Sequence, residues 1–409
     1  MRLIKIVFRS VIGLVVIFAV ALAGLVLYIQ SLHSRPVTLP APAGPYAVGR
    51  VEYDWVDPAR AETFGPGHDG QRELDVWVWY PVEPLSSNAA PAPYLPPAWR
   101  AAREQTQQPA FLAQLLLQDL SVVQPHAALA APLATAQASY PVLILQPGLG
   151  PIAPDYTTLA EDLASRGYVV AGSTPTYSSA VVVFPDGRVV PGIEVANVSD
   201  LATPAEAQQT LDKLIQVWAA DDSFVLSQMA ALNQSDPDGR FTGHLDLNNV
   251  GFWGHSFGGA SAAETCHLDR RCKAGLNLDG VPYGDVVQAG LDRPFMTLWS
   301  EPPSPSDANW QQSTRDMQQM ESRLGGDGYQ LMIRGSRHFN FTDSSVFYAP
   351  FLKLRGGLGP IDGQRFLSIS TTYTAAFFDH YLKGQAQPLL AGPSAQYPEV
   401  VFLSRWSAL

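Results

Sequence analysis

A serine at position 256 has the local sequence of a nucleophile. It lies in Gly254-His255-Ser256-Phe257-Gly258, directly after the apolar run Val250–Trp253 and before small residues that favour a helix start. This is the G-x-S-x-G pattern in the strand-turn-helix context that exposes a serine hydroxyl. The glycines are needed because a serine on so tight a turn has strained backbone and tolerates almost no side chain beside it. The chemistry indicated is attack on an ester or amide carbonyl.

Two residues that such a serine needs follow it, each just after an expected strand. Asp279 follows the run Ala274–Leu278, and His338 follows the run Tyr329–Ile333. Loops at the carboxyl ends of parallel strands meet at one edge of a sheet, so both residues can converge on Ser256. Nucleophile, acid and histidine in this chain order is the order of the α/β-hydrolases. We expect His338 to be the general base and Asp279 to orient it.

Glu301 competes with Asp279 for the role of the acid. It comes just after the expected strand Phe295–Trp299, a position that many α/β-hydrolases use for this carboxylate. Pro302 and Pro303 stiffen the loop beside Glu301 and can aim its side chain elsewhere. We therefore expect Asp279 to be the acid, with Glu301 as the alternative.

A second glycine-rich turn offers an oxyanion donor. The apolar run Pro141–Gln146 suits a central strand buried on both faces, and it ends in Pro147-Gly148-Leu149-Gly150. Serine hydrolases take one donor from such a turn and the other from the residue after the nucleophile. The expected donors are the backbone N–H groups of Leu149 and Phe257.

The elements that must position these residues alternate between strand and helix patterns. The sequence predicts antiparallel opening strands at 46–55 and 72–80, a helix at 155–166, a strand at 168–172, a hairpin at 181–190 and a long helix capped by Thr203-Pro204-Ala205-Glu206. This order predicts an α/β-hydrolase fold, with a mostly parallel central sheet flanked by helices and Tyr329–Ile333 as its last strand.

Composition restricts the classes of function. The 409 residues, 46% of them hydrophobic, suffice for one large core, and we expect one catalytic domain at 46–409. The net charge of -11 and the pI near 5.1 argue against a nucleic-acid partner, because no basic stripe is available to neutralise phosphates. No histidine-rich or paired-cysteine ligand spacing is present, so we expect no metal ion and no other cofactor.

The N-terminus differs in composition from the rest of the chain. Val11–Ile29 is nineteen residues without a charge, which as a helix rises about 28 Å and matches a bilayer core of roughly 30 Å. Arg2, Lys5 and Arg9 precede it, which favours a catalytic domain outside the cytoplasm. We expect residues 1–33 to be an uncleaved membrane anchor, with signal cleavage and secretion as the alternative.

Two further segments lie outside the expected core. Residues 34–45 contain four prolines, and we expect a spacer that does not pack against the domain. Residues 81–140 are rich in alanine, proline and glutamine, with helix-like patches at Ala98–Thr106 and Ala110–Leu120. This insertion is a candidate lid or substrate wall, or a surface loop, and the sequence leaves these alternatives open.

The only two cysteines, Cys266 and Cys272, fall between the helix after the nucleophile and the strand before Asp279. Oxidising surroundings outside the cytoplasm allow a disulfide to form and persist. The polar stretch Leu268–Arg271 can turn, which brings the two Cα atoms within about 6 Å of each other. We expect a disulfide that ties the helix to the strand, with two free thiols as the alternative.

Five segments together resemble the platelet-activating factor acetylhydrolase family of the plasma type. They are GHSFGG at 254–259, LNLDG at 276–280, GSRHFNFTD at 335–343, LQPGLG at 145–150 and AAFFDHYLKG at 375–384. The resemblance implies a metal-free serine esterase of α/β-hydrolase fold that hydrolyses short or oxidised acyl chains on phospholipids. It also implies Ser256 as the nucleophile, Asp279 as the acid, His338 as the base, and Leu149 and Phe257 as oxyanion donors.

The chain departs from that family around 85–140 and 176–200, the segments that should shape the acyl and alcohol pockets. One alternative is a polyester hydrolase or a general short-chain carboxylesterase, because related bacterial enzymes share these motifs. An alternative of another class is a catalytically inactive α/β-hydrolase that serves as a tethered binding module. The intact set of site residues argues against that second alternative.

Overall fold

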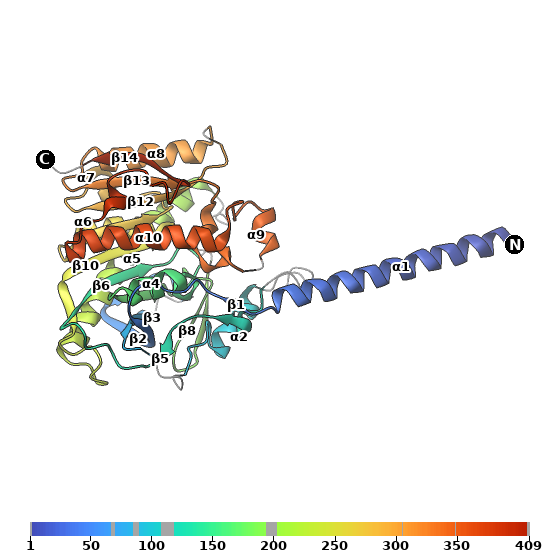
Figure 1. The fold of residues 1–409 in the computed structure, drawn as a ribbon, viewed down its shortest axis with the longest axis horizontal. Helices are drawn as coiled ribbons and strands as arrows, with labels where there is room; N and C mark the ends of the chain where they lie inside the picture. Colours follow the sequence, from blue (N-terminus) through green and yellow to red (C-terminus); the bar gives the residue numbers. More distant parts are fainter. Residues whose placement is uncertain are drawn as a thin grey trace.

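The computed structural model describes residues 2–66, 70–84, 90–107, 118–193, 203–304, 306–347 and 349–406. Its centre is a ten-stranded sheet with the strand order β14-β13-β12-β11-β10-β6-β7-β3-β2-β5. Helices cover the sheet, and α1 (Arg2–His33) projects away from the body of the molecule (Figure 1). The chain therefore has a mixed α/β fold built on one large sheet.

The sheet strands are β2 (Ala47–Ala61), β3 (Gln71–Val82), β5 (Ala128–Leu129), β6 (Tyr140–Gln146), β7 (Val169–Thr174), β10 (Leu245–His255), β11 (Cys272–Leu278), β12 (Phe295–Ser300), β13 (Gly328–Ile333) and β14 (Val400–Trp406). From β7 through β13 all neighbours pair in parallel, whereas β2 with β3, β3 with β7, and β13 with β14 are antiparallel. Every residue of β6 is buried, as expected for a strand covered on both faces. The predicted opening, central and nucleophile strands are confirmed.

The prediction that Tyr329–Ile333 forms the last strand is wrong. Strand β14 adds antiparallel to β13 as the edge of the sheet, with Leu331 opposite Phe402. The segment between α10 and β14 returns the chain to the sheet edge where β13 ends, so that Val400 pairs with Ile333 and β14 runs antiparallel to β13.

The remaining helices are α2 (Pro97–Gln107), α4 (Thr157–Ser165), α5 (Pro204–Gln234), α6 (Phe257–Leu268), α7 (Val286–Ala289), α8 (Ala308–Glu321), α9 (Pro350–Leu354) and α10 (Gly363–Lys383). The short strands β8 (Val181–Val183) and β9 (Val189–Pro191) form the expected hairpin. Helices α4 and α10 pack in one apolar cluster with side chains such as Leu159 and Phe377. Helices α5, α6 and α8 contribute to the cluster that contains Val225, Ala262 and Met317. Burying a Leu, Val, Phe or Met side chain in these clusters stabilises the fold by about 1.5–3 kcal/mol.

The predicted start of α5 is confirmed. The Thr203 side chain accepts a hydrogen bond from the Glu206 N–H at 3.2 Å, and Pro204 occupies the first helical position. This cap satisfies one of the N–H groups that the helix itself leaves without a partner. It fixes the beginning of the helix that packs behind the nucleophile strand.

Helix α1 is not packed against the domain. Its segment Phe8–Leu32 has a mean hydropathy of 2.9 and none of it is buried. Length and composition are sufficient for a membrane span, and a signal sequence near an N-terminus meets the same criteria. The expected apolar helix is present, and its topology stays a prediction.

The expectation that residues 34–45 do not pack is wrong. Leu39 is only 2% exposed, and β1 (Val37–Thr38) pairs with β4 (Val123–Gln124). The Ala43 and Gly44 N–H groups donate to side chains of α4, at 2.9 Å each. Proline lacks an N–H, so an extended proline-rich segment has few donors to satisfy and can lie along a domain surface.

The insertion at 81–140 is partly built into the domain. Helix α2 confirms the first helix-like patch, while most of Ala110–Leu120 lies outside the described residues. The Trp99 indole N–H donates to Glu52 at 3.2 Å, and Arg103 pairs with Asp155 at 2.7 Å. The described part of the insertion therefore lies against the sheet and the loop after β6.

A disulfide joins Cys266 and Cys272, whose Cα atoms are 5.1 Å apart. The bridge links the last turn of α6 to the first residue of β11. Both cysteines are buried, at 6% and 0% exposed. The pairing predicted from the sequence is confirmed in the structure.

Candidate active site

Ser256 lies in the turn between β10 and α6. Its backbone has φ 56° and ψ -125°, a conformation that costs about 1–3 kcal/mol for a residue other than glycine. The turn is held by the Ser256 N–H, which donates to the Leu278 carbonyl at 2.8 Å. A Cβ at Gly258 would lie 2.1 Å from the Gln146 carbonyl oxygen, so only glycine fits there. The glycines of the motif are therefore required by close backbone packing.

Asp279 and His338 lie in contact, although they are 59 positions apart in the sequence. The His338 Nδ1 lies 2.7 Å from Asp279 Oδ2, and the Asp279 carboxyl is largely buried. Asp279 itself has a φ of 58°, so the chain turns sharply where β11 ends. A carboxylate at this distance holds the proton on Nδ1 and leaves Nε2 as the acceptor.

Ser300 also belongs to the candidate site, although the sequence patterns did not predict it. Its N–H donates to Asp279 Oδ1 at 2.7 Å, and its hydroxyl donates to Oδ2 at 2.8 Å. These two bonds and the one to His338 fix the carboxylate. The available signal was its position at the carboxyl end of β12, the strand beside β11.

Glu301 does not contact the imidazole of His338. Its Oε2 accepts the Gly335 N–H at 2.8 Å, and its backbone oxygen accepts from the Arg337 guanidinium at 2.8 Å. Glu301 therefore braces the loop that precedes His338. In this geometry Asp279, and not Glu301, is the carboxylate paired with the histidine.

The turn after β6 lies against Ser256 and the start of α6. A Cβ on Gly148 would lie 3.2 Å from the Ser256 Cβ. Leu149 and Phe257 belong to one apolar cluster with Trp218 of α5. Within the described part of the chain, no backbone carbonyl accepts the N–H of Leu149 or of Phe257. These two N–H groups are the candidate oxyanion donors.

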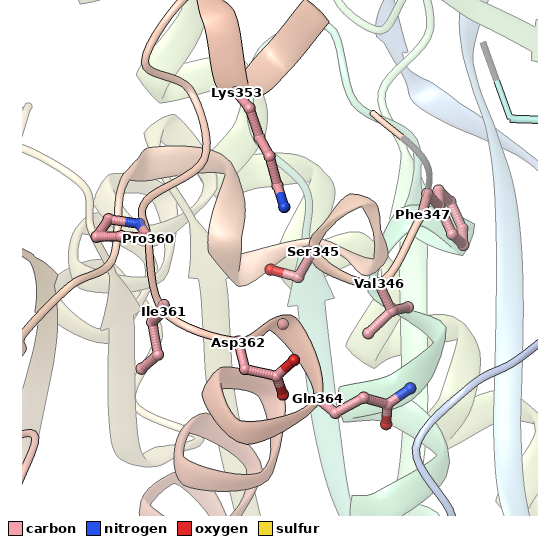
Figure 2. Close-up of a pocket in the computed structure, with 9 residues that line it drawn as sticks. Ser345, Val346, Phe347, Lys353, Pro360, Ile361, Asp362 and Gln364 are labelled. Carbon is pink, nitrogen blue, oxygen red and sulfur yellow. The ribbon is translucent and has the colours of Figure 1, made fainter. Parts of the chain in front are cut away.

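The loop that follows β13, residues 334–349, contains His338 and is called the His338 loop. A hollow of about 430 Å³ lies between residues 345–347 of this loop and the N-terminus of α10. Figure 2 shows Lys353, Ser345 and Asp362 around it. Neither Ser256 nor His338 lines it, so it is separate from these candidate site residues. Among the described residues, no three histidine, cysteine, aspartate or glutamate side chains are grouped so that they could hold a metal ion.

Comparisons with known proteins agree on one class. The family model for platelet-activating factor acetylhydrolase, isoform II, matches residues 31–186 and 204–387. A probable 1-alkyl-2-acetylglycerophosphocholine esterase of Arthroderma benhamiae is 29% identical over 282 residues, 64% of this chain and 66% of that protein, just under two thirds of its length. The platelet-activating factor acetylhydrolase of Cavia porcellus is 26% identical over 367 residues, 84% of this chain and 78% of its own.

A solved structure is also similar. The ferulic acid esterase from Streptomyces cinnamoneus matches with a TM-score of 0.72 at 30% identity, over 90% of this chain and 100% of its own. The name of this esterase and those of the two relatives describe the hydrolysis of carboxylic esters.

Proposed function

Since this chain belongs to the platelet-activating factor acetylhydrolase (isoform II) family and is a serine esterase, we propose that Ser256, His338 and Asp279 form its catalytic triad on an α/β-hydrolase fold. The observation that carries the proposal is the 2.7 Å contact of His338 Nδ1 with Asp279 Oδ2, at the sheet edge where the turn of Ser256 also lies. The relatives support an ester as the substrate.

The mechanism proceeds through an acyl-enzyme. His338 takes the proton of the Ser256 hydroxyl, whose oxygen attacks the ester carbonyl. Asp279 holds the imidazole and stabilises the imidazolium that forms. The N–H groups of Leu149 and Phe257 bind the developing oxyanion, and no backbone carbonyl of the described residues accepts either of them. Water then attacks the acyl-enzyme with His338 as the base.

The proposed substrates are short-chain or oxidised acyl esters, including phospholipids of the platelet-activating-factor type. Support comes from the family and from a helix able to cross a membrane, which would hold the domain at a lipid surface outside the cytoplasm. Figure 1 shows α1 leaving on the same side as α9, which follows the His338 loop. The 81–140 insertion is the proposed substrate wall, because its Tyr94 contacts Asp343 and Phe347 of that loop.

A second candidate is a general carboxylesterase for simple esters. The 30% identity to the ferulic acid esterase over nearly the whole chain favours it. The two candidates are distinguished by comparing kcat/KM for 1-alkyl-2-acetyl-glycerophosphocholine with kcat/KM for p-nitrophenyl esters from acetate to palmitate. A preference for the acetyl phospholipid supports the first candidate. Hydrolysis of the simple esters without hydrolysis of the phospholipid supports the second. If no ester is hydrolysed, the alternative of an inactive binding module is favoured.

A further inference from the structure

A continuous chain of hydrogen bonds runs behind the proposed nucleophile. The Gly148 N–H donates to the Tyr156 hydroxyl at 3.0 Å, and that hydroxyl lies 2.8 Å from His255 Nδ1. The other ring nitrogen, His255 Nε2, lies 3.0 Å from the backbone oxygen of His338. The side chains of Tyr156 and His255 are both fully buried. The chain therefore links the glycine turn after β6 to the backbone of the proposed general base.

The partners fix where each proton lies. A carbonyl oxygen can only accept, so His255 Nε2 carries a proton and donates it to the His338 carbonyl. In the neutral imidazole Nδ1 is then an acceptor, so the Tyr156 hydroxyl donates to it. The hydroxyl oxygen is left to accept the Gly148 N–H. Burial holds the pKa of His255 well below its usual value, which keeps the ring neutral.

The two ends of this chain carry different parts of the proposed chemistry. Gly148 directly precedes Leu149, whose N–H is a proposed oxyanion donor. His338 is the proposed base, and its ring lies 4.5 Å from the His255 ring, between centroids. An error of about 1 Å in the position of either group costs orders of magnitude in rate. Tyr156 and His255 are hydrogen-bonded to the backbone at both of these places.

We propose that Tyr156 and His255 are positioning residues. They fix the turn that carries the Leu149 N–H and the proposed base His338 in the correct positions on either side of Ser256. The proposal rests on the proposed function. Burying a hydroxyl and an imidazole costs stability unless both are fully hydrogen-bonded, and here every bond is made. Their role is therefore to orient the groups on either side, an effect that an apolar pair of equal volume would not supply.

The first test is Tyr156→Phe, with Tyr140→Phe as the matched control. Tyr140 is also fully buried, and its hydroxyl donates a single bond, to the Ala134 carbonyl at 3.0 Å, from the opposite end of β6. We expect kcat for p-nitrophenyl acetate to fall at least about tenfold in Tyr156→Phe with KM changed less than about twofold, because only the transition state loses stabilisation. Tyr140→Phe should lower the unfolding midpoint similarly and leave kcat unchanged.

The second test asks whether the bonds of His255, and not its volume, are responsible. His255→Phe keeps a ring against His338 but loses both bonds, whereas His255→Gln keeps one donor and one acceptor. We expect Gln to retain more of kcat than Phe. Because Tyr156 and His255 act in one chain, the double variant with Phe at both positions should lose less than the product of the single losses.

Active-site titration with a fluorophosphonate distinguishes a failure of the proposed function from a failure of the positioning role. If the wild-type protein is not labelled at Ser256, the proposed function fails. If it is labelled, but Tyr156→Phe retains the wild-type kcat or His255→Gln is as slow as His255→Phe, the positioning role is refuted while the proposed function stands.

Discussion

The choice between two carboxylates can be tested by one substitution, Asp279→Asn. Asp279 accepts from donors on both of its oxygens: the Ser300 N–H on Oδ1, and the Ser300 hydroxyl and His338 Nδ1 on Oδ2. Asparagine has one oxygen and one NH₂, so one of these donors must face the NH₂. A backbone N–H cannot change its role, but an imidazole can move its proton.

The expected outcome is therefore that the asparagine oxygen stays opposite Ser300 and that its NH₂ faces His338. Nδ1 then becomes an acceptor and the proton moves to Nε2, where it blocks general-base catalysis. Replacing a triad aspartate by asparagine lowers kcat by about 10⁴-fold, because the histidine then has the wrong tautomer. Leaving the Ser300 N–H without an acceptor instead would cost about 1–3 kcal/mol of stability.

Glu301→Gln is the matched control. Only one of the Glu301 side-chain oxygens accepts a hydrogen bond from a described residue, from the Gly335 N–H, and the glutamine oxygen can take its place. We expect kcat to change by less than about tenfold. The assay is initial-rate hydrolysis of p-nitrophenyl acetate, with thermal unfolding to verify folding. A mild Asp279→Asn beside a damaging Glu301→Gln would refute the assignment of the acid.

Three further predictions concern stability. Asp222, buried and bonded to the Ser261 and Thr265 hydroxyls, has its pKa raised to about 8 by burial. An unfolded carboxyl titrates near about 3.9, so the folded state binds the extra proton between these values and stability falls as the pH rises from about 4 to about 8. Urea unfolding of Asp222→Asn should show that fall reduced, and an unchanged pH dependence would contradict the raised pKa. Replacing both cysteines of the disulfide by alanine should lower the free energy of unfolding by about 2 kcal/mol, and an unchanged urea midpoint would contradict it. Gly258→Ala should abolish folding or activity, because its Cβ would meet Gln146, whereas Gly392→Ala has open space and should melt as the wild type does in circular dichroism.

The arrangement of the candidate site residues could be predicted because their positions are encoded locally. A strand, two glycines and a serine determine a strained turn, and the strand-end positions of Asp279 and His338 follow from the topology of a parallel sheet. The capping of α5 and the pairing of the two cysteines are likewise short-range patterns. In each of these cases the interacting groups lie within a few residues or at equivalent ends of strands.

Contacts that depend on packing between distant segments could not be predicted. Ser300 reaches Asp279 only because β12 lies beside β11 in register, and a position at the end of a strand does not by itself show which residue it contacts. The docking of Leu39 against the domain depends on the fit of an extended segment to a surface that forms only on folding. The edge position of β14 could not be predicted for the same reason, because it depends on pairing with β13.

The link through His255 illustrates this limit at the site itself. From the sequence, His255 is only the neighbour of the nucleophile, and Tyr156 is one of several aromatic residues near a helix start. Their hydrogen bonds to each other and to the His338 backbone exist only after three loops have converged at the sheet edge.

The central claim, that Ser256 is the nucleophile of a serine esterase, is tested most directly by fluorophosphonate labelling with identification of the modified residue by peptide mass spectrometry. We predict stoichiometric labelling of Ser256 in the wild-type protein, together with loss of ester hydrolysis. Ser256→Ala should not be labelled, yet should unfold at nearly the wild-type temperature. Labelling that persists in Ser256→Ala, or ester hydrolysis that survives the substitution, would contradict the account.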